Sequence, residues 1–465
     1  MAKTYDELKY EVKNGFCEIS EADKAEMFAF CDDYKDYLGK GKTERQCCDL
    51  SLKQAVAAGF VPLESKQTLA AGDKVYSVNR GKGIVLAVIG EEPVQNGANI
   101  VGAHIDVPRL DLKPNPLYED GGFSLFKTHY YGGIKKYQWT AIPLAIHGVV
   151  ILADGSLVDI NIGEDENDPV FCITDLLPHL AQEQMKKNLS EAIAGEGLNV
   201  LIGNVPDNDK DAKEKVKSHT LKLLHEKYGI REEDFISAEI EIVPAFMPRD
   251  IGFDRSMVAG YGHDDRVCSF AALRAVLDVE KPKRTAICLL VDKEEIGSCG
   301  NTGMKSRWFE NFVAKLCNMQ SENYNDILTR DALANSICLS ADVGAAFDPN
   351  YPEVNEKRNT AIVNGGLMIT KYTGSRGKSG ASDASAEFVG KVRKIFEDNS
   401  VLWQTGLLGK VDLGGGGTIA QYVANLDIDT LDCGVPLLSM HSPYEVAGKV
   451  DIYMAYKGYK YFMLS

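Results

Sequence analysis

Hydrophobic positions along this chain form short apolar runs that are separated by amphipathic stretches. In the first part, these runs predict strands at residues 74–78, 83–89 and 99–103. From about residue 254 onward, helical and buried-strand patterns alternate, with expected elements at residues 269–279 (helix), 285–291 (strand), 304–315 (helix) and 336–341 (strand). Alternation of this kind predicts an α/β fold, with a mostly parallel sheet that is flanked by helices.

The N-terminal residues predict helices that precede the first strand. Residues 5–20 have a helix-like pattern, and Ser20-Glu21-Ala22-Asp23 is a typical cap that opens a further helix. No site residue falls in this part, so we expect it to serve as packing scaffold.

Between the two parts of the α/β pattern, the sequence no longer alternates between helical and strand patterns. Residues 112–243 contain short β-rich runs such as 145–152, which are separated by turn signals such as Ala153-Asp154-Gly155-Ser156. We interpret residues 111–246 as an inserted β-rich domain that mediates dimerisation. Residues 1–110 and 247–465 then form one catalytic domain.

Length, charge and cysteine content narrow the function classes. A chain of 465 residues is long enough for two cores, and a net charge of −16 repels phosphate backbones and anionic membranes. We therefore expect no nucleic acid and no membrane as partners. The N-terminus lacks the pattern of a secretory signal, and the 11 cysteines form no metal-binding pair, so we expect a cytoplasmic protein with reduced thiols.

Candidate metal ligands follow the predicted strands or lie in nearby loops. His104 follows the strand at 99–103, Glu295 follows the strand at 285–291, and Asp342 follows the strand at 336–341. Carboxyl ends of parallel strands meet at one edge of a sheet, so these residues can converge. Imidazole and carboxylate suit zinc and are also acceptable to manganese or cobalt. The full candidate set is His104, Asp265, Glu295, Asp342 and His441, with Asp265 as the carboxylate that bridges two cations.

Two acidic residues next to these ligands are candidates for catalysis. Asp106 lies two positions after His104, on the same side of an extended segment, where its carboxylate can orient the imidazole. Glu294 precedes Glu295, and adjacent side chains diverge, so Glu294 can face the attacking water as general base.

Each of these residues has an ordinary structural alternative. A single histidine after a strand is more often a core residue than a ligand, a Glu-Glu pair is usually solvated, and single aspartates usually cap helices or turns. The combination favours a site, because three apolar runs each end in an acid or a histidine.

The chain resembles the aspartyl aminopeptidase and vacuolar aminopeptidase I family, metallopeptidase family eighteen, and within it the bacterial-type branch. The landmarks cover nearly the whole chain: Ala103-His104-Ile105-Asp106-Val107-Pro108, Tyr131-Gly132-Gly133 with Trp139, Asp292-Lys293-Glu294-Glu295-Ile296-Gly297-Ser298, Asp342 with Pro349-Asn350-Tyr351, and Leu438-Ser439-Met440-His441-Ser442-Pro443-Tyr444-Glu445.

The resemblance implies a co-catalytic zinc exopeptidase fold and the same ligand set, with Asp265 as bridge and Glu294 as base. It also implies that His179, in Pro178-His179-Leu180, reaches the active site of a neighbouring subunit, with a buried structural histidine as the alternative. Family members build homododecamers from dimers, and the same assembly is implied for this chain.

Several positions depart from the family pattern. Where the family often has Leu-Asp-Asn around the bridging aspartate, this chain has Asp264-Asp265-Arg266, so Asp264 is a rival for the bridge. Ala345 replaces a common histidine, and the glycine-rich segment 373–378 resembles the bacterial branch. These departures leave open which N-terminal residue is preferred.

The resulting prediction is a zinc metalloaminopeptidase that hydrolyses the N-terminal peptide bond of peptides, with two divalent cations and Glu294 as base. Arg376 and Lys378 are candidates to pair with an acidic side chain or a peptide carboxylate, with surface cations as the alternative. A related carboxypeptidase or deacylase, and a non-catalytic self-assembling scaffold, stay open as other functions.

Overall fold

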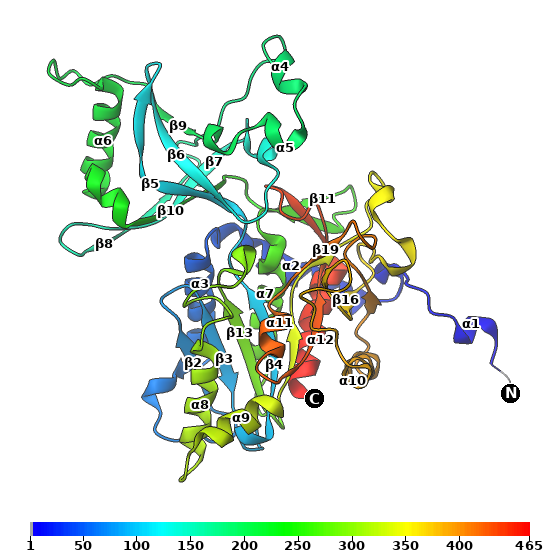
Figure 1. Ribbon diagram of the computed structural model, residues 1–465. Helices are drawn as coiled ribbons and strands as arrows, with labels where there is room; N and C mark the ends of the chain where they lie inside the picture. Colours follow the sequence, from blue (N-terminus) through cyan, green and yellow to red (C-terminus); the bar gives the residue numbers. More distant parts are fainter. Residues whose placement is uncertain (1–2) are drawn as a thin grey trace.

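The computed structural model describes residues 3–465, and a nine-stranded sheet forms its centre (Figure 1). The order is β1 (Val61–Pro62), β2 (Lys74–Val78), β3 (Ile84–Val88), β13 (Thr285–Val291), β4 (Ala98–His104), β14 (Ile337–Ser340), β20 (Asp429–Gly434), β16 (Leu367–Thr370) and β18 (Trp403–Thr405). The four strands β13, β4, β14 and β20 are parallel, and β3 and β16 are antiparallel neighbours on either side. The α/β prediction is confirmed, and the sheet is mixed: the pairs β2–β3, β3–β13 and β16–β20 are antiparallel, and the other pairs are parallel.

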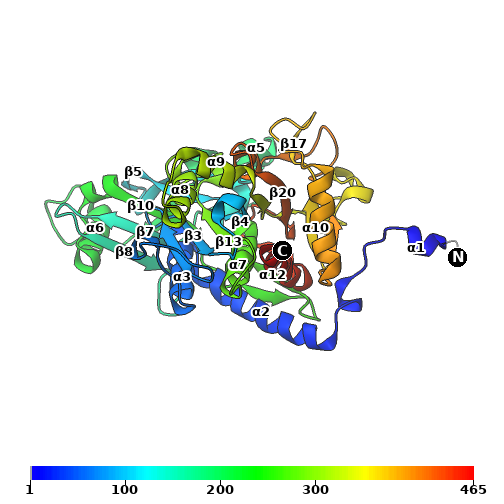
Figure 2. The same cartoon turned by 90° about the horizontal axis from the view of Figure 1, so that it is seen from below.

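Helices cover both faces of this sheet (Figure 2). Alternate residues of β13 supply the two cores: Cys288 and Leu290 pack on one face, and Ile287 and Leu289 on the other. The first face is covered by α2 (Glu21–Lys40), α3 (Glu44–Ala57), α7 (His263–Leu277), α10 (Ala386–Asp398) and α12 (Lys449–Leu464). The second face is covered by α8 (Trp308–Gln320), α9 (Asp326–Ala334) and α11 (Ala420–Ala424).

The N-terminal prediction is half right. The Ser20 hydroxyl accepts a hydrogen bond from the amide of Asp23 and caps α2 as expected. The expected helix at residues 5–20 is wrong, because the structure has only α1 (Tyr5–Leu8) and a short 3-10 turn (Gly15–Cys17) there. Tyr10 instead stacks on the distant Trp403 at a ring separation of 5.7 Å. The helix α1, which precedes Tyr10, lies away from the body of the molecule (Figures 1 and 2).

A second sheet of six strands stands beside the first and contains most of the β-rich segment (Figure 1). Its order is β8 (Leu157–Ile162), β7 (Leu144–Ile151), β10 (Ala238–Pro244), β5 (Arg109–Asp120), β6 (Phe123–Tyr131) and β9 (Val200–Gly203), with α6 (Lys215–Tyr228), α4 (Gln182–Met185) and α5 (Leu189–Ala192) alongside. The chain enters through β5 and leaves through β10, and these strands are neighbours that pair at Leu110 and Ile242. The predicted domain boundaries and the role in dimerisation stay predictions.

Two smaller sheets are formed by other strands of the described residues. One contains β11 (Arg249–Ile251), β12 (Met257–Gly260), β22 (Glu445–Gly448), β21 (Pro436–Leu438) and β15 (Gly344–Ala345), and another pairs β17 (Gly374–Ser375) with β19 (Gly415–Gly416). Within residues 3–465, no helix has both the length and the apolar character that a membrane span requires.

Candidate metal centre and active site

The carboxyl ends of the parallel strands meet at one edge of the central sheet, and most candidate residues lie there. His104 is the last residue of β4, Asp342 lies two residues beyond β14, and β13 leads into a 3-10 turn, Glu294–Ile296. Asp264 lies at the start of α7, and His441 lies in the turn between β21 and β22. The parallel arrangement therefore places residues that are far apart in sequence around one point.

Asp264 lies between the two histidines. Its Oδ1 is 3.1 Å from Nε2 of His104, and its Oδ2 is 3.1 Å from Nε2 of His441. One carboxylate thus faces both imidazoles, which is the arrangement that a bridging ligand requires.

The other three acids surround this pair. Glu295 Oε2 lies 3.5 Å from Nε2 of His441, and Asp342 Oδ1 lies 3.9 Å from Nε2 of His104. Glu294 Oε2 lies 4.0 Å from the same nitrogen of His104. The structure therefore brings four of the five predicted ligands and the predicted base together.

The fifth predicted ligand, Asp265, is not among them. Asp265 is fully buried, and its carboxylate oxygens have no hydrogen-bond partner among the described residues. The carboxylate between the histidines belongs to Asp264, which the sequence had offered only as a rival. Asp264 and Asp265 have non-helical backbone angles, so the register of α7 does not decide which of the two faces the histidines.

Asp106 contacts His104 through its carboxylate, as predicted, and also through its backbone carbonyl: Oδ1 lies 3.2 Å from Nδ1 of His104. Its backbone carbonyl accepts a hydrogen bond from Nδ1–H of His104 at 3.0 Å, and its carboxylate accepts hydrogen bonds from the amides of Glu294 and Glu295 at 3.1 and 3.2 Å. A protonated Nδ1 leaves Nε2 of His104 as the nitrogen that can bind a metal.

The cluster contains four acids, Asp264, Glu294, Glu295 and Asp342, and two histidines. Burial raises the pKa of Glu294 to about 7 and holds the pKa values of Glu295 and Asp342 well above their ordinary values. Burial also acts on Asp264, but its contacts with His104 and His441 outweigh this effect and lower its pKa. A cluster of buried carboxylates of this kind favours divalent cations.

The donor atoms fit a metal. One atom each from His104, Asp264 and Glu295 lie within 4.8 Å of one another, and the same is true of His104, Glu294 and Asp342. Oε1 of Glu295 is buried, and no described residue satisfies it. Imidazole and carboxylate donors in such groups suit zinc.

Sequence reasoning missed the residues that hold His441 in place. The Glu445 carboxylate accepts hydrogen bonds from the amides of His441 and Asp264 at 2.7 and 3.2 Å. Nδ1–H of His441 donates to the carbonyl of Gly133 at 2.8 Å. Both Glu445 and Gly133 stand in the segments that carried the family resemblance, and that was the available signal.

Gly434 allows β20 to approach the loop of Asp342. A Cβ atom at Gly434 would lie 1.8 Å from the carbonyl oxygen of Asp342, which is too close to be accommodated without moving the backbone. We expect Gly434→Ala to lower the free energy of unfolding by about 1–3 kcal/mol and to weaken metal binding.

Gly390→Ala is the matched control for this prediction. Gly390 lies in α10, and a Cβ atom there meets nothing within 4 Å, so alanine is expected to add about 1 kcal/mol of stability. Denaturant unfolding of the two variants checks the prediction, and equal stabilities would contradict it.

A cleft of 520 Å³ opens beside the cluster. Its lining includes Asp264, Glu294, Asp342 and His441, and it also includes both predicted substrate contacts, Arg376 and Lys378. Lys378 pairs with Asp383, with Nζ 3.1 Å from Oδ2, and lies 3.8 Å from the centre of the Tyr372 ring.

His179 is exposed and lies in the segment before α4, within the β-rich insertion. The cleft lining, as far as the described residues define it, does not include His179. Its predicted contact with another subunit stays a prediction, and the alternative of a buried histidine is wrong.

Comparisons with known proteins give the family and the fold. A family model described as aminopeptidase I zinc metalloprotease (M18) matches residues 37–463. A Clostridium acetobutylicum protein named "Probable M18 family aminopeptidase 1" is 52% identical, over 98% of this chain and 99% of its own. The crystal structure of a Thermotoga maritima M18 aminopeptidase is similar, with a TM-score of 0.94 at 45% identity, over 98% of this chain and 99% of that one. A dodecameric aminopeptidase 1 from S. cerevisiae shares the fold, with a TM-score of 0.74 at 22% identity, over 93% of this chain and 95% of that one.

Proposed function

The chain belongs to the M18 family of aminopeptidase I zinc metalloproteases, and on this basis we propose that it removes N-terminal residues from peptides with two divalent cations. Family membership makes the protein a metal-dependent aminopeptidase, and the predicted family and reaction class are confirmed. The number of cations and the roles of individual residues are our proposal.

The position of Asp264 is the observation that carries the proposal. Each of its oxygens lies 3.1 Å from a different histidine, so we propose Asp264 as the ligand that two cations share. His104 and Asp342 would complete one site, and His441 and Glu295 the other.

The residues around the centre have distinct tasks in this mechanism. Bound cations supply Lewis-acid polarisation of the scissile carbonyl and lower the pKa of water. Glu294 takes the proton of the attacking water and returns it to the departing amine, a task that suits a carboxylate whose pKa burial raises to about 7. Asp106 holds the backbone of Glu294 and fixes the tautomer of His104.

Arg376 and Lys378 are proposed to bind substrate groups, because both line the cleft. A cation there can pair with an acidic side chain or with a peptide carboxylate. Lys378 already pairs with Asp383, which leaves the preferred N-terminal residue to experiment.

Hydrolysis of aminoacyl anilides bearing Leu, Lys, Asp or Glu tests the proposed function. We expect a chelator to remove the activity and zinc, cobalt or manganese to restore it, with two cations bound per chain. The same substrates with a blocked N-terminus are the control and should not be hydrolysed. A single bound cation in the active protein, or hydrolysis that persists in the chelator, would contradict the proposal.

We also propose that the chain self-associates through the insertion, as dimers that build a dodecamer. Support comes from exposed apolar side chains around His179: Leu176, Leu177, Leu180, Met185 and Leu189. Large exposed apolar patches mark interaction sites. Sedimentation of the whole chain tests this assembly, and a monomer would contradict it.

A further inference from the structure

Asp106 connects the active site to the six-stranded sheet. Besides its contacts with His104, Glu294 and Glu295, its Oδ2 accepts a hydrogen bond from the hydroxyl of Tyr131 at 2.8 Å. Asp106 is fully buried, and Tyr131 is the last residue of β6 in the inserted segment. The insertion therefore contacts the carboxylate that positions the base and two ligands.

Tyr131 is itself held by Arg109. The guanidinium carbon of Arg109 lies 3.8 Å from the centre of the Tyr131 ring, where the cation can interact with the ring face. Arg109 is the first residue of β5, which pairs with β6 at these two positions. The two side chains therefore form one unit at the base of the inserted sheet.

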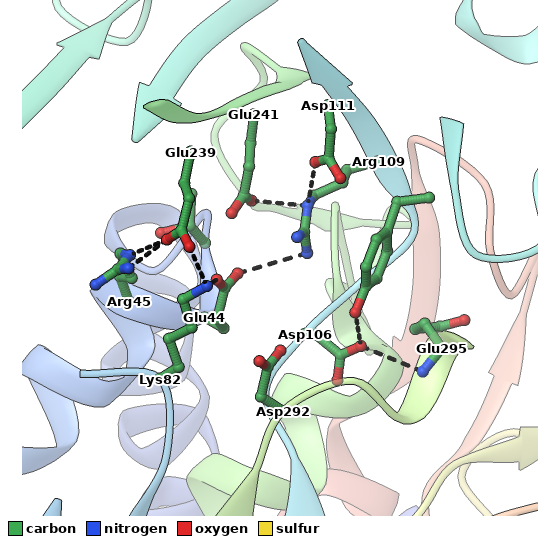
Figure 3. Close-up of polar contacts among 12 residues, drawn as sticks. Glu44, Arg45, Lys82, Asp106, Arg109, Asp111, Glu239, Glu241, Asp292 and Glu295 are labelled. Carbon is green, nitrogen blue, oxygen red and sulfur yellow. Dashed lines mark hydrogen bonds and ion pairs between the residues drawn. The ribbon is translucent and has the colours of Figure 1, made fainter. Parts of the chain in front are cut away.

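Three carboxylates from different elements fix Arg109 in turn (Figure 3). Its Nε donates a hydrogen bond to Asp111 at 2.8 Å and lies 3.3 Å from Oε2 of Glu241 in β10, and its Nη1 lies 3.4 Å from Oε2 of Glu44 in α3. Arg109 and Glu44 are 7% and 2% exposed. Only the contact with Asp111 is a hydrogen bond, because Nη1 of Arg109 and Oε2 of Glu44 and of Glu241 have no hydrogen-bond partner among the described residues. The hydrogen bond sets the direction of the Arg109 side chain, and the two glutamates lie beside its cation.

We propose that Arg109 and Tyr131 are positioning residues for the reaction, and that they couple the inserted sheet to Asp106. The Tyr131 hydroxyl holds Oδ2 of Asp106, so that Oδ1 stays directed at the amide of Glu294. Arg109 keeps the ring of Tyr131 in place from the junction of β5, β10 and α3. The inserted segment thereby contributes to the active site of its own chain. The inference rests on the proposed function.

Tyr131→Phe tests this coupling, because it removes only the hydroxyl. Loss of an outer hydrogen bond to a metal site typically costs about 10–100-fold in metal affinity or activity. We expect kcat to fall by about 10-fold or more, with little change in KM, and zinc affinity to fall as well. Zinc affinity is measured on chelated protein by competition with a chromophoric chelator, so it does not depend on turnover.

Tyr130→Phe is the matched control. Tyr130 precedes Tyr131 in β6, but its side chain is 43% exposed. It should leave kcat, KM and zinc affinity unchanged. Equal behaviour of the two variants would overturn the proposal.

Arg109→Lys tests the second link and retains the positive charge beside Glu44 and Glu241. A lysine cannot place a planar guanidinium on the Tyr131 ring, so kcat should fall in this variant too. If Arg109 acts through Tyr131, its effect should largely vanish in the Tyr131→Phe background. Fully additive effects would overturn the coupling.

Failure of this inference differs from failure of the proposed function. A wild-type protein that binds zinc but hydrolyses no anilide would refute the proposed function, and the zinc affinities of the Tyr131 and Tyr130 variants would still decide the inference. Active wild-type protein with an unaffected Tyr131→Phe variant would refute the inference alone.

Discussion

Glu294→Gln is expected to lower kcat by about 10²–10⁴-fold, the range for loss of a positioned general base, while zinc stays bound. Glutamine has nearly the same shape as glutamate, but its amide cannot take a proton from water. Glu294 lies outside the two proposed ligand sets, which are His104 with Asp342 and His441 with Glu295. Removing its charge should therefore affect proton transfer more than metal binding.

Anilide hydrolysis together with metal content measured by atomic absorption checks this prediction. Glu322→Gln is a control with the same chemical change at an exposed residue, and it should behave like the wild type. If Glu294→Gln keeps its metal and also keeps its rate, Glu294 is not the base. If it loses the metal, Glu294 acts as a ligand instead.

Asp264→Asn is expected to have the second large effect, a loss of more than about 100-fold in zinc affinity, beyond the range for outer-shell residues. The Asp264 oxygens face both histidines, so its loss would disturb both proposed cation sites. An asparagine offers one neutral oxygen instead of two charged ones.

Asp265→Asn is the matched comparison for this prediction. Burial raises the pKa of Asp265 well above its ordinary value, which disfavours its charged form, so a neutral asparagine should be tolerated there. We expect zinc affinity to change by less than about 10-fold, below the effect of even an outer-shell loss. Zinc titration of both variants, after a chelator has removed their metal, decides between the two residues. A larger loss of zinc affinity in Asp265→Asn than in Asp264→Asn would make Asp265 the bridge.

The sequence predicted the parts of the fold that depend on local pattern. The predicted strands at 285–291 and 336–341 consist of apolar or small residues, and the structure has β13 and β14 there. Their ends point to Glu295 and Asp342, because parallel strands finish at a common edge. These strand ends therefore indicate the location of the site in the sequence.

Features that depend on contacts between distant segments could not be predicted. Asp264 and Asp265 have the same side chain in adjacent positions, and only their backbone angles decide which one faces the histidines. Tyr10 packs on Trp403 from the other end of the chain, which no local pattern encodes. Helix propensity is a weak prior that such tertiary contacts override.

The contact of Tyr131 with Asp106 is another such case. Tyr131 belongs to the segment Tyr131-Gly132-Gly133 that carried the family resemblance. The residues next to it in the sequence do not indicate that its hydroxyl contacts Asp106, which follows β4. The pairing of β5 with β6 brings the ring of Tyr131 to Arg109 and the hydroxyl of Tyr131 to Asp106.

The entry and exit of the insertion through neighbouring strands affects how the chain folds. β4 must pair with β13 across the whole insertion, and closing so long a loop costs conformational entropy. Once β5 and β10 have paired at Leu110 and Ile242, the residues between them no longer add to the length of the loop that must close. The entropic cost of pairing β4 with β13 then falls by about 1 kcal/mol. Early folding of the insertion would therefore accelerate completion of the central sheet, and with it the pairing of β4 with β13 that brings His104 to the edge where Glu295 lies.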